Sequence, residues 1–337
     1  MFPLFAVHAP LSVIVLIALA LAFAYLNGYN DSGSMMAAVI STGAAGARRA
    51  LILAAACNFV GPFLVGNAVA VVVGTGLVYP DAVTLASLAA GLLAAIAWTA
   101  IETHFGMPTS STQALLGGLI GGGIAVAGFG AVQITGVVIL VLALVIVPIL
   151  SGLVGWLSMR LTLWLARGAS PKINATFRHG QLVTSVLLAI SHGAAGVPKI
   201  VGIIVLILAR AGLVSGFTIP IWVVFLASLS MSVAIALGGW KVIRTLSARI
   251  YRLRPVHGFL SQGVAAAMVL GFTVVGLPVS TGQVSTSTLI GAGASERLSK
   301  VRWQVAQHLA LSWVVTLPIT ALLAFILYPI TRLAFHS

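Results

Sequence analysis

The chain is built largely from apolar runs that are long enough to cross a membrane. The first, residues 11–26, reads LSVIVLIALALAFAYL. About 20 apolar residues span a bilayer as a helix, and the sequence offers roughly ten such runs. Of its 337 residues 60% are hydrophobic and 6% are charged, whereas about 25% of an ordinary soluble domain is charged. The sequence therefore predicts an all-α, polytopic integral membrane protein, which we expect in a bacterial inner membrane and in contact with the lipid bilayer.

The positive charge is confined to a few loops. The formal net charge is +13, but the basic residues lie between apolar runs without interleaved aromatic residues, which is typical of cytoplasmic loops and excludes a nucleic-acid partner. Four clusters contain most of the lysines and arginines: Arg48 and Arg49; Arg160, Arg167, Lys172 and Arg178; Lys241, Arg244, Arg249, Arg252 and Arg254; and Arg297, Lys300 and Arg302.

Placing all four clusters in the cytoplasm requires an even number of crossings between successive clusters. With the N-terminus outside, the runs 11–45, 50–74, 82–104, 106–124 and 133–159 provide five crossings. The second half repeats this pattern from residue 181, with uncharged turns near 212–217 and 274–277. On this topology Glu102 lies near the cytoplasmic end of its span, where we expect a solvated residue.

Two sequence signatures occur once in each half. GYND at 28–31 precedes GMPTSSTQ at 106–113, and HGAAG at 192–196 precedes GLPVSTGQ at 276–283. Charged loops of one half match uncharged loops of the other, so the copies are out of phase by one membrane face. With five crossings each, the second copy is inverted. We expect a first repeat over 1–165, a basic cytoplasmic linker over 166–180, and an inverted second repeat over 181–337.

Inverted repeats favour a transporter, because two halves related by an in-plane axis can expose a central site alternately to either side. Gly- and Ser-rich stretches inside the apolar runs, such as 27–34, predict broken helices at the midplane. Helix N-termini that begin there point N–H groups and a positive dipole end inward, where they bind anions.

The later signature of each half predicts a hydroxyl-rich helix N-terminus. Proline suits a first helical turn, and Ser or Thr satisfies the unpaired N–H groups or presents them to a ligand. Two such ends that meet across the repeat axis would surround a tetrahedral oxyanion with donors. The candidate substrate ligands are Ser110, Ser111, Thr112, Gln113, Ser280, Thr281 and Gln283, with Ser285 as a weaker candidate.

Asp31 is one of four acidic residues in the chain. A carboxylate at membrane depth costs at least about 2.5–3.5 kcal/mol, so it marks a functional site. Asp31 and Asn30 offer oxygen ligands for sodium, or Asp31 carries a proton. Lys199 occupies the matching position of the other half and contacts the anion, or it pairs with Asp31. Asn27 and His192 are weaker candidates, and no other cofactor or metal is expected.

These motifs resemble the inorganic phosphate transporter family of cation-coupled permeases. Its members carry a Gly-x-Asn-Asp motif and a later Gly-x-Pro-x-Ser-(Ser/Thr)-(Ser/Thr)-His motif in each repeat, and the resemblance covers nearly the whole chain. It implies that residues of both motifs line the anion and coupling-ion sites: Asn30, Asp31, Ser110, Ser111, Thr112, Ser280 and Thr281. It also implies a homodimer.

The second repeat departs from the family pattern. Ala195 and Gly196 replace the second Asn-Asp pair, and Gln113 and Gln283 replace the histidines. Phosphate near neutral pH keeps a P–OH group that needs an acceptor, whereas sulfate needs only donors. The loss of acceptors leaves sulfate, or another tetrahedral oxyanion, as an open alternative to phosphate.

The sequence thus predicts a secondary transporter that moves inorganic phosphate inward, coupled to sodium or to protons. It contains no Gly-x-x-x-x-Gly-Lys-(Ser/Thr) loop for ATP. It also lacks the nucleophile with a base, the carboxylate pair or the metal cluster that an enzyme would need. A passive channel, or an anion sensor that has lost transport, is the remaining alternative.

Overall fold

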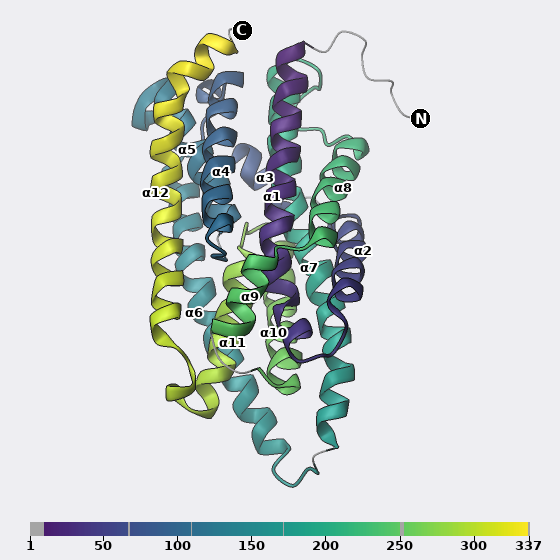
Figure 1. Cartoon of the computed structure of the whole chain (residues 1–337). Coiled ribbons are helices and arrows are strands. Elements are labelled where there is room, and N and C mark those ends of the chain that lie inside the picture. Colours follow the sequence, from purple (N-terminus) through teal and green to yellow (C-terminus); the bar gives the residue numbers. More distant parts are fainter. Residues whose placement is uncertain (1–9, 67, 109, 171, 250–252, 336–337) are drawn as a thin grey trace.

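The computed structural model describes residues 10–335 except 67, 109, 171 and 250–252, so Thr109 of the first hydroxyl-rich signature and Arg252 of the third basic cluster lie outside the described residues. The described residues are helical, as predicted, and Figure 1 shows them as one elongated bundle. In chain order the elements are α1 (Leu11–Ser41), α2 (Ala47–Val65), α3 (Ala68–Thr75), η1 (Pro80–Ala82), α4 (Leu85–His104), α5 (Ser111–Ala127), η2 (Gly128–Ala131), α6 (Ile134–Leu165), α7 (Ile173–Arg210), α8 (Ile221–Leu237), α9 (Trp240–Arg249), α10 (Pro255–Val274), α11 (Thr281–Glu296), η3 (Leu298–Lys300) and α12 (Trp303–Ala334).

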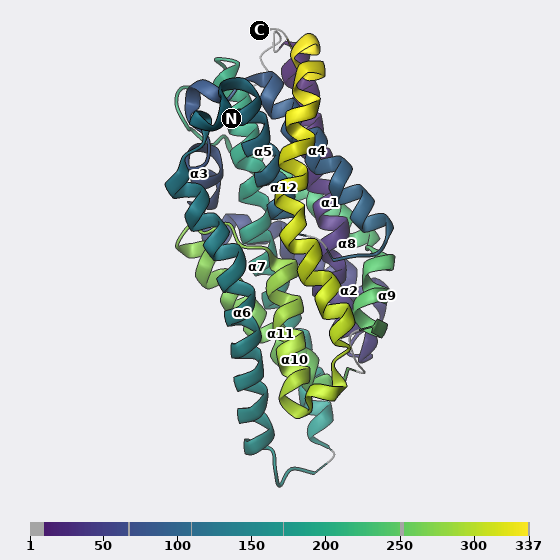
Figure 2. The ribbon, with the colours of Figure 1, turned by 90° about the vertical axis from the view of Figure 1, so that its left-hand side faces the viewer.

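The two halves contain corresponding α-helices in the same order. Each has a long first helix (α1, α7), a broken pair (α2 with α3, α8 with α9), a helical hairpin (α4 with α5, α10 with α11) and a long last helix (α6, α12). The hairpins lie at opposite ends of the bundle in both views (Figures 1 and 2). This is the arrangement that an inverted duplication predicts. The helix α7 begins at Ile173, within the stretch 166–180 that we expected to be a linker.

The hairpins correct the expected topology. The runs 82–104 and 106–124 do not cross the bundle separately, because α4 and α5 both occupy one end and join near its middle (Figures 1 and 2). Gly106 makes this turn with φ +69°, and Gly276 makes the equivalent turn with φ +80°. Each hairpin replaces two crossings, so the parity of the topology is unchanged and the basic loops still gather at one end.

The long first helices are continuous, which also differs from prediction. We expected a break at 27–34, but α1 is helical from Leu11 to Ser41, and α7 passes unbroken through Pro198. The glycines of α1 instead allow close packing: Gly28 lies against Met231 of α8 and Gly33 against Val242 of α9, with no room for a Cβ. The breaks lie at the hairpin turns and in the paired helices, where α8 and α9 meet at 61°.

The helix α5 packs through two faces of small residues. Gly118 and Gly122 meet the backbone of α4, and Gly117 and Gly121 meet the backbone of α12 around Leu317 and Ala321. Glycines at i and i+4 let helix backbones approach closely and strengthen van der Waals packing in a membrane. In this conformation these contacts pack the hairpin closely against the last helix of the chain.

Replacing Gly121 with leucine should destabilise the fold. A Cβ at Gly121 would overlap the backbone of Ala321, which cannot rotate away as a side chain can, so the cost is expected to reach about 3 kcal/mol or more. The measurement is the yield of monodisperse protein by size-exclusion chromatography after detergent extraction. Gly271→Leu is the matched control, since nothing lies near its Cβ position. Equal yields of the two variants would contradict this packing.

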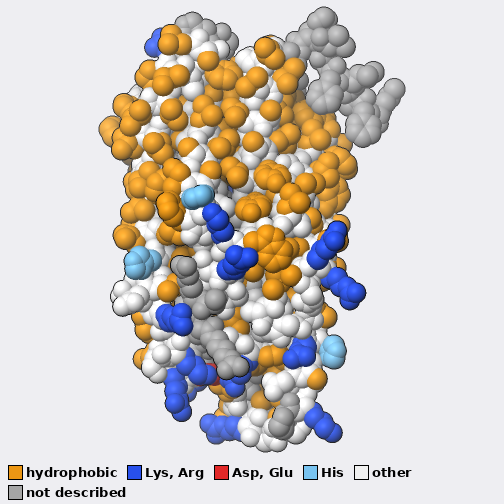
Figure 3. Space-filling model, viewed as in Figure 1, with side chains coloured by type: hydrophobic (Ala, Val, Ile, Leu, Met, Phe, Trp, Pro, Cys, Tyr) orange, Lys and Arg blue, Asp and Glu red, His pale blue; other side chains and the backbone are white. Residues whose placement is uncertain are grey.

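The surface is that of an integral membrane protein. Eight helices of the described chain are long and apolar enough to cross a bilayer, and α6 and α12 expose many large apolar side chains. On the face shown in Figure 3, hydrophobic side chains cover the upper part and most lysines and arginines lie below. The lower end, where α6 and α7 connect, is the one that the positive-inside rule assigns to the cytoplasm.

Candidate functional site

The two hairpin turns form matching helix N-termini. The Ser110 side chain caps α5 by accepting a hydrogen bond from the Gln113 N–H at 3.2 Å, and Ser280 caps α11 by accepting from the Gln283 N–H at 3.4 Å. The cap therefore comes two residues after the proline of each signature. Because a capping hydroxyl keeps its own hydrogen, both serines remain able to donate to an anion.

The two turns meet in the interior. The Thr112 hydroxyl donates to the carbonyl of Val279 at 3.3 Å, so the start of α5 touches the turn before α11. Lys199 of α7 joins both: its ammonium donates to Thr112 Oγ1 at 2.5 Å and to the Val279 carbonyl at 3.3 Å. Residues from three separate parts of the sequence thus converge on one buried cation.

The polar residues of α1 line the other side of this centre. Ser111 donates to Asn27 Oδ1 at 2.6 Å, and Asn30 Nδ2 donates to the Met107 carbonyl at 3.2 Å. Ser285 of α11 donates to the Ser34 carbonyl at 2.9 Å. These hydrogen bonds join α1 to both hairpins. Asn27, Asn30 and Ser285 therefore stabilise the packing of α1 against the hairpin turns.

Asp31 lies beside Lys199 in this interior. Its side chain is buried, Lys199 is the charged group that acts on it, and Nδ1 of His192 lies 3.9 Å from Asp31 Oδ2. The second carboxylate oxygen, Oδ1, has no hydrogen-bond partner. A buried carboxylate with a free oxygen is suited to hold a small cation.

Several other buried polar atoms on α1 and α11 are also without a partner: Thr281 Oγ1, Gln283 Nε2, Ser34 Oγ and Thr286 Oγ1. Buried polar atoms in folded proteins nearly always have a hydrogen-bond partner, so each exception needs an explanation. Lys199, the Thr112 hydroxyl and the two capped helix N-termini are groups that can donate hydrogen bonds to an oxyanion, and Asp31 can accept one.

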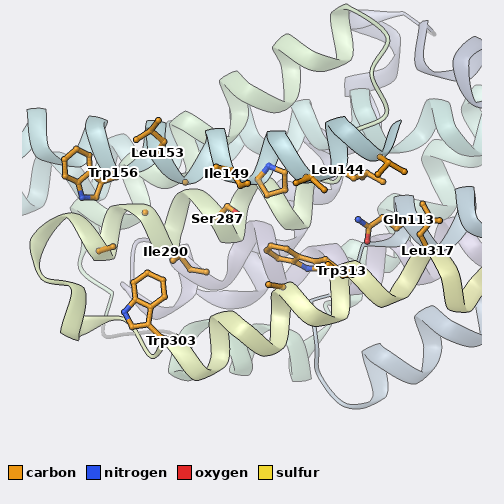
Figure 4. A pocket seen from close by; sticks show the side chains of 18 of the residues that line it. Gln113, Leu144, Ile149, Leu153, Trp156, Ser287, Ile290, Trp303, Trp313 and Leu317 are labelled. Carbon is orange, nitrogen blue, oxygen red and sulfur yellow. The ribbon is translucent and has the colours of Figure 1, made fainter. Parts of the chain in front are cut away.

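Gln113 occupies a different place. Its side chain lines an apolar groove of about 820 Å³ between α6, α11 and α12, at the end opposite Trp156 and Trp303 (Figure 4). The walls of this groove are almost entirely hydrocarbon, which cannot replace the water around an anion. The groove is therefore not the anion site, and the structure does not bring Gln113 to Lys199 as the sequence led us to expect.

The missing Asn-Asp pair of the second half leaves a gap that α8 fills. A Cβ on Gly196 would meet Met231 Sδ at 3.2 Å, so a thioether occupies the space where α7 would otherwise present a carboxylate. The site consequently has one carboxylate, Asp31, and is not symmetric.

Glu102 lies deeper than its place in the sequence suggested. We expected a solvated carboxylate at a span end, but α4 ends inside the bundle, and Glu102 is 4% exposed. Its neighbour Thr103 accepts a hydrogen bond from Asn30 at 2.8 Å, which ties this part of α4 to α1 beside Asp31. A second carboxylate thus lies in the interior near the site.

Comparisons with known proteins agree with this architecture. The model of the phosphate transporter family matches residues 27–324. A protein of Bacillus subtilis named probable low-affinity inorganic phosphate transporter is 37% identical over 96% of this chain and 98% of its own length. A protein of the same name from Rhizobium meliloti is 35% identical over 93% and 94%. A solved structure named the sodium-dependent phosphate transporter has the same fold, with a TM-score of 0.86 at 22% identity over 96% of this chain and 99% of that one.

Proposed function

Because this chain belongs to the phosphate transporter family, we propose that it moves inorganic phosphate inward as a symporter, driven by a cation bound at Asp31. The observation that carries the proposal is the contact of Lys199 with both hairpin turns. One lysine that touches both halves can exchange these contacts for a shared anion.

Phosphate binds between the hairpin turns. Lys199 transfers its hydrogen bonds from Thr112 and the Val279 carbonyl to phosphate oxygens, because charge-assisted bonds to an anion are stronger than those to neutral acceptors. The serines that cap α5 and α11 donate their hydroxyl hydrogens, and the two helix N-termini stabilise the negative charge. Asp31 accepts the proton of the P–OH group or acts through the bound cation.

In this proposal the bound cation compensates the negative charge of phosphate inside the membrane. Asp31 Oδ1, which has no hydrogen-bond partner, is one ligand oxygen, and the side-chain oxygen of Asn30 is the second. Oxygen ligands suit sodium, which is a hard cation. The alternative is that Asp31 takes up a proton and that phosphate transport is coupled to protons. Sodium has additional support from the fold shared with a protein named as sodium-dependent.

Uptake of labelled phosphate by liposomes that contain the pure protein tests this function. Sodium and proton gradients are imposed separately, and unlabelled arsenate and sulfate compete. We expect arsenate to block uptake and sulfate to have little effect, because only phosphate and arsenate present an O–H group to the acceptor Asp31. The gradient that drives uptake identifies the coupling ion, and the absence of uptake against a gradient would contradict transport.

Sulfate is the second candidate substrate. Ala195 and Gly196 remove one acceptor pair, and Gln113 and Gln283 stand where the family has histidines. A site with many donors and one acceptor suits a fully ionised anion. Stronger competition by sulfate than by arsenate would favour this alternative.

A further inference from the structure

Glu102 is a buried carboxyl group that phosphate binding does not use. It lies on α4 before the first hairpin turn and contacts α12, where Ser312 donates a hydrogen bond to its Oε1. Trp98 Nε1 donates to Thr316 Oγ1 at 3.1 Å, and Thr316 donates to the Ser312 carbonyl at 2.7 Å. This short chain of hydrogen bonds joins the first hairpin to the last helix.

The surroundings of Glu102 are uncharged. The groups that act on its carboxyl are Ser312, Thr316 and Trp98, and among the described residues no lysine, arginine or histidine forms an ion pair with it. Among the described side chains, the other charged groups on α4 and on the helices packed against it are His104 on α4, Asp31 on α1, Lys241 and Arg244 on α9, His308 and Arg332 on α12, and Arg178, His179, His192, Lys199 and Arg210 on α7, and none of them forms an ion pair with Glu102. An ionised carboxylate without compensation is very costly here.

Two oxygen atoms beside each other on α4 have no hydrogen-bond partner, which points to a bound proton or small ligand at this place. Glu102 Oε2 and Thr99 Oγ1 are both buried, both lack a hydrogen-bond partner, and lie one turn apart on α4. A carboxylic acid proton on Oε2 neutralises the charge in place. Sodium fits less well, because Trp98 presents an N–H donor and the few remaining oxygens do not complete a hard-cation shell.

We propose that Glu102 is a second coupling group, which holds a proton in this conformation and releases it when the first hairpin moves away from α12. The inference rests on the proposed function, since it assigns the proton to the transport cycle. On release the O–H bond of the carboxylic acid breaks, its electron pair stays on Oε2, and a water molecule takes up the proton. Thr103 beside Glu102 accepts a bond from Asn30, so the motion also reaches the residue next to Asp31.

Infrared difference spectroscopy of the pure protein over a pH titration tests proton binding without any need for transport. We expect a protonated-carboxyl band that Glu102→Gln removes, that Glu102→Asp shifts, and that Asp31→Asn and the exposed-site control Asp81→Asn retain. A spectrum in which Glu102→Gln removes no band would overturn the proposal, as would a band that responds to sodium instead of pH.

Transport assays separate coupling from structural support. In liposomes, Glu102→Gln should lower uptake driven by a proton gradient at least tenfold, whereas exchange of internal for external phosphate, which needs no proton release, should stay within twofold of wild type. A purely structural role predicts that both rates fall together or that neither changes. If Glu102→Gln does not fold, Glu102→Asp provides the test, because it should shift the pH dependence of proton-driven phosphate uptake. If wild type moves no phosphate at all, the proposed function fails, and the infrared band still decides whether Glu102 binds a proton.

Discussion

Asp31→Asn is expected to reduce phosphate uptake driven by an ion gradient by at least about 100-fold, because the attraction of a carboxylate for a cation about 4 Å away in a partly buried site is worth roughly 4 kcal/mol. Asparagine keeps the size and the oxygen of the side chain but not its charge. The hydrogen bonds from Ser111 to Asn27 and from Asn30 to the Met107 carbonyl, which join α1 to the first hairpin, do not involve Asp31. The loss should therefore appear mainly in coupling, and because Lys199 then lacks the negative charge that acts on it, some loss of thermal stability should accompany it.

Concentrative uptake of labelled phosphate in liposomes measures this loss, with Asp81→Asn as the control because Asp81 is exposed. Circular dichroism and gel filtration establish that the variant is folded. If Asp31→Asn accumulates phosphate at the wild-type rate under the same gradient, Asp31 is not the coupling group.

Lys199→Gln is expected to weaken phosphate binding by about 10–100-fold, because a hydrogen bond from a charged group contributes roughly 1.5–3 kcal/mol. The substitution also leaves Asp31 without the positive charge that acts on it. Removing one member of a buried charged pair is strongly destabilising, whereas removing both is often tolerated. Asp31→Asn/Lys199→Gln should accordingly be more stable than Lys199→Gln alone.

Thermal unfolding of the two single variants and of the double variant measures the coupling between these residues, and equilibrium phosphate binding measures the loss of the ligand contact. Lys172→Gln serves as the control, since Lys172 is an exposed lysine in the connection between α6 and α7. Additive effects of the two single changes on stability would show that Asp31 and Lys199 act independently.

Local sequence chemistry predicted the helix starts of the site. A proline followed by serines and threonines indicated where α5 and α11 begin, and the structure places their caps at Ser110 and Ser280. The matching positions of Asp31 and Lys199 in the two halves left open whether Lys199 contacts the anion or pairs with Asp31; in the structure Lys199 donates to Thr112 and to the Val279 carbonyl and acts on Asp31 electrostatically. Helix caps and charged residues within apolar runs can be recognised from a few neighbouring residues, so the sequence alone predicts them.

Depth within the bundle was not predictable in the same way. An apolar run of 20 residues indicates a helix of a certain length but not whether its apolar side chains face lipid or protein. In the most apolar 18-residue stretch of α4, 67% of the residues are buried inside the protein, whereas in that of α6 only 28% are. Only the structure shows that α4 belongs to a hairpin that ends in the interior, and the misplacement of Glu102 followed from this ambiguity.

The expected break at 27–34 failed for a related reason. Gly28 and Gly33 weaken an isolated helix, but in the bundle they admit Met231 and Val242 from the neighbouring helices. The van der Waals attraction between these closely packed helices outweighs the intrinsic preference of glycine for unwinding. A glycine in a membrane helix therefore signals either a break or a close approach, and sequence alone does not separate the two.

Asp31 and Lys199 are two buried groups of opposite charge that act on each other without a direct hydrogen bond, and this has an electrical consequence. When Asp31 is ionised and Lys199 is protonated, the two charges sum to zero. A membrane potential acts on each uncompensated elementary charge with about 2.3 kcal/mol per 100 mV, and it has little effect on a neutral pair. In the proposed transport cycle, voltage would therefore act through the bound ions and through Glu102 once it has released its proton, and not through the charges of Asp31 and Lys199. If the proposed symport is correct, the number of cations that accompany each phosphate would decide whether the negative interior of a cell favours or opposes accumulation.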